Sequence, residues 1–203
     1  QGCLSLKDRP VLGRKQWQGL LDILDILAEA IRGLEKKNPH ASLESLELEL
    51  TGMYERVSAI QNQPAEWATT LAWLTGEGSE RVAKRFLELL EGYPHLHRDS
   101  LTDLQLYLDL LGHHLQDIQR SLNLFAPWLS HLEALPALFM DSPDWQVFRG
   151  SLPEEMPTLG QAGFVYDKIR TALRKFQGQW QDVAAQEWCR KLEADLLSAR
   201  MAV

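Results

Sequence analysis

The sequence predicts an all-α fold, a multi-helix bundle of about eight helices with a proline-rich elbow before the last two. Apolar residues recur at spacings of three and four in several long segments, and proline or glycine stands at the ends of these segments, whereas the alternation typical of strands is nearly absent. A content of 45% apolar and 24% charged residues is typical of a globular chain. We expect one helical domain over residues 14–203, or two parts divided near 126–157, after an N-terminal tail or linker at 1–13.

The first half of the chain contains the clearest helical patterns. One apolar stripe covers residues 14–37 and ends at Asn38-Pro39, because a residue that precedes proline disfavours helical torsions. Ser42 is the expected N-cap of a second helix that reaches Ile60. A short third helix begins at Pro64 and is stopped by Thr75-Gly76. A fourth begins at Ser79 and ends at Gly92-Tyr93-Pro94.

The longest pattern is a leucine-rich stripe that predicts a central helix from Ser100 to about Phe125. Ser100 and Asp103 approximate a capping box. Leu106 and Leu110 lie opposite the stripe, so we expect this helix to pack on more than one side. The stripe consists of Leu101, Leu104, Leu108, Leu111, Leu115, Ile118 and Leu122.

Five prolines between residues 127 and 157 break the pattern and predict the elbow. Two further helices are expected, from Thr158 to Phe176 and from about Gln179 to Met201.

Charge and composition exclude several classes of function. A formal net charge of −7 disfavours a nucleic-acid surface, which needs clustered lysine and arginine. We interpret the one basic cluster, at residues 168–175, as an exposed helix face in preference to a phosphate site. The two cysteines offer neither a disulfide framework nor a zinc knuckle. No apolar run is long enough to span a bilayer directly.

Catalytic motifs are absent from the sequence, which lacks nucleophile elbows, phosphate loops and paired-histidine zinc helices. Asp109, His113 and Asp117 are spaced by four and share a helix face, where they form a metal site or, as we prefer, a solvated surface. We therefore assign no catalytic residue, no metal and no cofactor.

The segment after Phe125 is more apolar than an elbow requires. It is interpreted either as a loop packed into the core or as a docking patch, because large exposed apolar patches mark interaction sites. The candidate patch consists of Trp128, Leu129, Leu132, Leu138, Phe139 and Met140.

Three features together resemble the helical region of cyclic β-1,2-glucan synthases. These are a leucine-rich helix leading into Asn123-Leu124-Phe125-Ala126-Pro127-Trp128-Leu129, a proline-broken stretch with Pro157-Thr158-Leu159, and a last helix with Glu187-Trp188-Cys189-Arg190-Lys191-Leu192 and Ser198-Ala199-Arg200. In those large bacterial enzymes the region lies between the membrane-embedded glycosyltransferase part and the glucoamylase-like and phosphorylase-like parts. The resemblance covers most of the chain from about residue 14 onward.

The resemblance implies a parent glycosyltransferase that builds β-1,2-glucan on itself from UDP-glucose and cyclises it at the cytoplasmic face of the bacterial inner membrane. The chain carries none of the family's catalytic motifs, so its implied role is a soluble, non-catalytic scaffold whose partners are the neighbouring catalytic domains, with glucan contact as an option. The family's protein-linked glucan suggests an exposed hydroxyl as the tether, with Tyr166 as the candidate. The alternative is a free-standing helical adaptor that binds a protein through the patch at residues 129–140.

Overall fold

The computed structural model describes residues 14–60, 66–133, 161–177 and 183–201 of the chain. These residues are mostly helical and contain no strand, which confirms the all-α prediction for this part of the chain; a total of eight helices is not confirmed. The helices are α1 (Arg14–Lys37), α2 (Glu44–Ile60), α3 (Trp67–Trp73), α4 (Ser79–Gly92), α5 (Arg98–Glu133), α7 (Ala162–Gln177) and α8 (Val183–Met201).

The described residues fall into two compact units, one made of Arg14–Asp117 and the other of the described residues from Ile118 onward. The division lies inside α5, upstream of the 126–157 range that the sequence suggested. The two units are described separately below.

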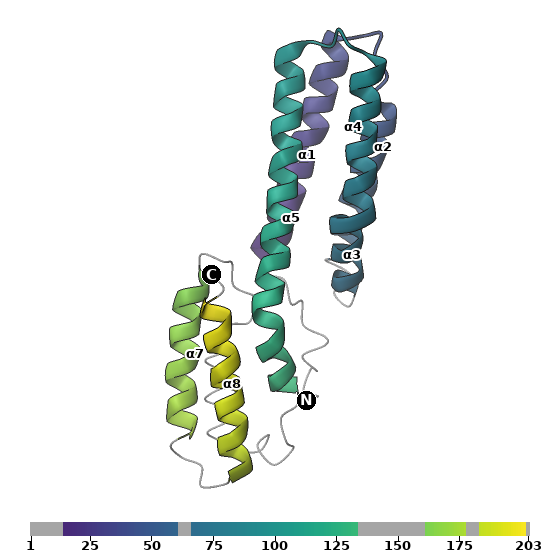
Figure 1. Ribbon diagram of the computed structural model, residues 1–203. Helices are drawn as coiled ribbons and strands as arrows, with labels where there is room; N and C mark the ends of the chain where they lie inside the picture. Colours follow the sequence, from purple (N-terminus) through teal and green to yellow (C-terminus); the bar gives the residue numbers. More distant parts are fainter. Residues whose placement is uncertain (1–13, 61–65, 134–160, 178–182, 202–203) are drawn as a thin grey trace. The chain divides into compact units, whose positions relative to one another are not determined.

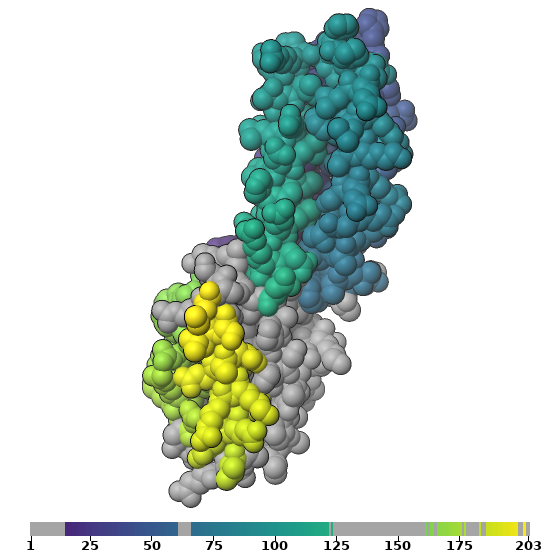
Figure 2. Space-filling view, viewed as in Figure 1, coloured from purple at the N-terminus to yellow at the C-terminus, as the bar shows by residue number. Residues whose placement is uncertain are grey.

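The Arg14–Asp117 unit is a bundle in which successive long helices run antiparallel (Figure 1). Helix α2 packs against α1 on one side and against α4 on the other. On the face of the bundle that Figure 2 shows, side chains of α4 and of the first part of α5 cover the surface. Fully buried side chains at three- and four-residue spacing form the core, because such spacing places them on one helix face. Its largest members include Leu20, Leu27, Ile31, Leu34, Leu46, Met53, Leu71 and Leu104.

The bounds of helices α1 and α2 agree closely with their apolar patterns. The bounds of α1 are those the apolar stripe predicts, and Lys36 and Lys37 in its last turn complement the helix dipole. Helix α2 begins at Glu44, and the carbonyl of Leu43 accepts hydrogen bonds from the backbone N–H groups of Leu46 and Glu47 at 3.0 and 2.9 Å. Leu43 therefore precedes the helix, and the prediction that Ser42 is its N-cap is wrong.

The helix that begins before Trp73 is interrupted at Thr75-Gly76 as predicted. Gly76 has the non-helical torsions φ −107° and ψ −106°, which kink the chain within the π-helical segment Leu74–Gly78 that joins α3 to α4. The Trp73 ring covers this segment: a Cβ added at Gly78 would lie 2.8 Å from the ring. The Arg56 guanidinium of α2 lies 4.0 Å from the centroid of the same ring, a cation–π distance. Glycine at position 78 thus allows Trp73 to pack between the π-helical segment and α2.

Helix α5 is longer at both ends than the pattern predicts. It begins at Arg98, so Ser100 lies in its first turn and is not its N-cap. It also passes through Pro127 to Glu133, although Pro127 cannot donate a helical hydrogen bond to the carbonyl of Asn123. Leu106 and Leu110 are 62% and 47% exposed. At these two positions the prediction of packing on more than one side is wrong.

The second unit contains a helical hairpin in which α7 packs against α8 (Figure 1). Tyr166, Ile169 and Leu173 are buried on α7, and Trp188, Cys189, Leu192 and Leu196 are buried on α8. Helix α7 covers Ala162–Gln177 and α8 covers Val183–Met201, and the predicted starts at Thr158 and about Gln179 lie outside the described residues.

Candidate functional site

A polar cluster joins α1, α5 and the loops beside them at one end of the Arg14–Asp117 bundle. The Lys37 ammonium donates a hydrogen bond to the Ser100 hydroxyl at 2.8 Å, and that hydroxyl lies 3.4 Å from His97 Nδ1. Asn38 Oδ1 accepts a hydrogen bond from the backbone N–H of His97 at 3.0 Å, and Asn38 Nδ2 donates to the carbonyl of Leu34 at 2.8 Å.

A serine between an amine and an imidazole is also the arrangement of an activated nucleophile. Here, however, Ser100 is only 7% exposed, so a substrate carbon has no approach to its hydroxyl in this conformation. The hydroxyl accepts a hydrogen bond from the Lys37 ammonium and can donate one to His97 Nδ1. We therefore interpret the cluster as a connection between helix ends.

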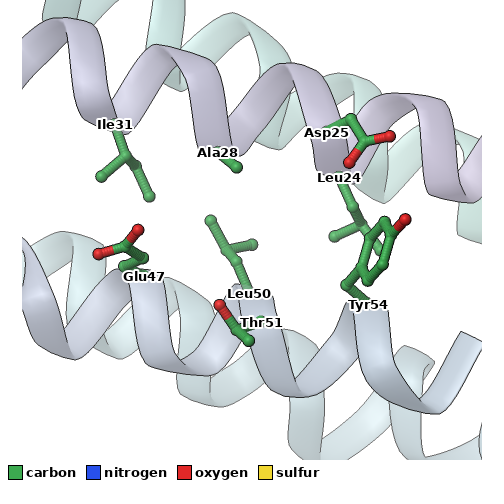
Figure 3. A pocket seen from close by; sticks show the side chains of 8 residues that line it. All are labelled: Leu24, Asp25, Ala28, Ile31, Glu47, Leu50, Thr51 and Tyr54. Atoms are coloured by element: carbon green, nitrogen blue, oxygen red, sulfur yellow. The ribbon is translucent and has the colours of Figure 1, made fainter.

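A shallow groove of about 190 Å³ runs between α1 and α2 (Figure 3). Leu24, Ile31 and Leu50 form its floor and are at most 3% exposed. Ala28 lies at its centre, and the small side chain of this residue produces the hollow. The volume is below the about 300–1,000 Å³ of pockets that enclose small molecules. The groove suits one or two inserted side chains better than a whole cofactor.

The rim of the groove is polar and carries two carboxylates. Asp25 and the Tyr54 hydroxyl lie at one end, and Glu47 lies at the other (Figure 3). Thr51 completes the α2 side. None of the residues that line the groove is basic, so its rim attracts cations.

The structure places Asp109, His113 and Asp117 on α5, where all three are exposed. His113 Nδ1 donates a hydrogen bond to the carbonyl of Asp109 at 2.7 Å, which turns the ring toward its own helix. Within the described ranges, no group of three or more His, Cys, Asp or Glu residues is placed to hold a metal ion.

The predicted docking patch is only partly covered by the described residues. Trp128, Leu129 and Leu132 belong to α5 and do not form a loop. Leu138, Phe139 and Met140 lie outside the described residues. The patch stays a prediction.

Tyr166, the candidate glucan tether, is 4% exposed on α7. A tether needs its hydroxyl exposed to the transferring sugar, and Tyr54 on the groove rim is the more exposed tyrosine at 38%. The tether likewise stays a prediction, which peptide mapping of enzyme incubated with UDP-glucose would test.

The basic cluster on α7 is partly neutralised. Arg170 Nε and Arg174 lie 3.5 and 3.4 Å from Glu193 Oε1 on α8. These ion pairs link the two helices of the hairpin, as expected if the cluster lies on an exposed helix face.

Cys189 lies on the buried side of α8. Burial, followed by the negative charge of Glu193 as the smaller cause, raises the pKa of the Cys189 thiol to about 11.

Neither the groove nor the polar cluster at the bundle end is predicted by a sequence pattern. Ala28 interrupts the leucine stripe of α1 with a small residue, a signal that could have indicated a hollow. Nothing in the sequence pairs Lys37 with Ser100, which are 63 residues apart.

Among the described helices, none is both long enough and apolar enough to cross a membrane. Comparisons of the chain with protein-family models, with curated proteins and with solved structures found no match.

Proposed function

We propose that this chain is a non-catalytic helical scaffold domain of a cyclic β-1,2-glucan synthase, whose catalytic parts transfer glucose from UDP-glucose. The resemblance of residues 123–129, 157–159 and 187–200 to the helical region of that family supports the identity of the parent. In that parent the chain would act beside the cytoplasmic face of the bacterial inner membrane, with the neighbouring catalytic domains as its partners.

The polar contacts between helices are the observation that best supports a scaffold. The interhelical polar contacts join one helix to another across a leucine core. Lys37 is bonded to Ser100 across α1 and α5, Glu49 of α2 lies 3.6 Å from Arg85 of α4, and Arg170 lies 3.5 Å from Glu193 across α7 and α8. Such interhelical hydrogen bonds and ion pairs help to fix the relative positions of the helices. A spacer between catalytic domains requires this property.

A first test is the coding sequence on both sides of this segment. A scaffold of this kind is encoded inside a longer reading frame that also carries glycosyltransferase and phosphorylase-like parts. A reading frame without these parts would overturn the proposal in favour of the free-standing adaptor.

A second test uses membranes that contain the intact synthase and labelled UDP-glucose. Replacing both Lys37 and Asn38 by Ala loosens one end of the bundle, and Lys36→Ala is the matched control because Lys36 is exposed on the same turn. We expect the double variant to release less cyclic glucan for each protein-linked chain started, with the KM for UDP-glucose unchanged.

Two other results would contradict the proposal. If the double variant stays folded but its KM for UDP-glucose changes, the cluster takes part in sugar transfer, and the non-catalytic assignment is wrong. If the ratio of cyclic to protein-linked glucan equals that of Lys36→Ala, the bundle does not set the geometry between the catalytic parts.

A further inference from the structure

We draw no further inference here: the strongest candidate, the exposed apolar surface that Leu106 and Leu110 form on α5 in the Arg14–Asp117 unit, is an unpartnered helix face, and nothing in the described part of the structure shows what covers it.

Discussion

The side chain of Asn38 accepts a hydrogen bond at 3.0 Å from the backbone N–H of His97, which lies 59 residues later in the chain. This bond joins the loop after α1 to the loop before α5. The amide nitrogen of the same side chain donates to the carbonyl of Leu34 and so also caps the C-terminal end of α1. One residue thus ends a helix and closes one end of the bundle.

Replacing Asn38 by Ala should lower the free energy of unfolding of the Arg14–Asp117 unit by about 1–2 kcal/mol, because two hydrogen bonds are lost together. Urea denaturation followed by circular dichroism measures this change. His40→Ala is the control, since His40 is exposed in the same loop. Equal stabilities of the two variants would show that the Asn38 bonds contribute nothing in solution.

Gly19 and Gly33 lie on the same helix and should respond oppositely to substitution by Ala. A Cβ at Gly33 meets nothing within 4 Å, whereas a Cβ at Gly19 would lie 2.9 Å from His114 Nε2. That nitrogen lies 3.1 Å from the carbonyl of Gln16, to which it must donate because a carbonyl only accepts. We expect Gly33→Ala to raise the free energy of unfolding by about 1 kcal/mol and Gly19→Ala to lower it by about 1 kcal/mol.

A double-mutant cycle checks the cause of this difference. With His114→Ala as the background, the contact is gone, so Gly19→Ala should become stabilising as Gly33→Ala is. If Gly19→Ala stays destabilising in that background, His114 is not the reason that position 19 requires glycine.

Cys189 should make stability depend on pH in the alkaline range. The pKa of its thiol rises from 9.0 to about 11 on folding, because the side chain is buried. Between these values the unfolded chain has lost the thiol proton and the folded chain has kept it, so the unfolding free energy falls as pH rises. Below the lower value the thiol is protonated in both states and this dependence disappears.

The measurement compares the Cys3→Ser chain with and without Cys189→Ala by urea denaturation at pH about 8 and about 10.5. The chain that keeps Cys189 should lose up to about 2 kcal/mol more than the Ala variant over this interval. The contributions of the other titrating groups to the unfolding free energy are the same in both chains and cancel in the comparison. The same loss in both chains would mean that Cys189 ionises freely in the folded state.

Several local features of the fold could be predicted because neighbouring residues determine them. The three- and four-residue spacing of apolar side chains in α1 predicts both its bounds and its buried face. The end of α4 at Gly92 follows from the Gly-Tyr-Pro sequence there. In each case the side chains that end the helix belong to the helix itself or to the next few residues.

Other features depend on contacts that no local pattern contains. Ser100 has the chemistry of an N-cap, yet helix α5 begins two residues before it and Lys37 uses the hydroxyl instead. Gly76 interrupts the helix as its sequence predicts, but the packing of Trp73 over Gly78 beside this kink has no local sequence signal. Leu106 and Leu110 are apolar, yet no described helix covers them.

The amino-acid sequence by itself determined that this protein is helical and which stripe of most helices is buried, because helix periodicity and apolar burial act over a few neighbouring residues. Only the tertiary structure decided that Asn38 meets His97, that Lys37 meets Ser100 and that a groove opens over Ala28. Each of these relationships needs two helices at a particular distance and rotation. Packing sets that distance and rotation through residues far apart in the chain.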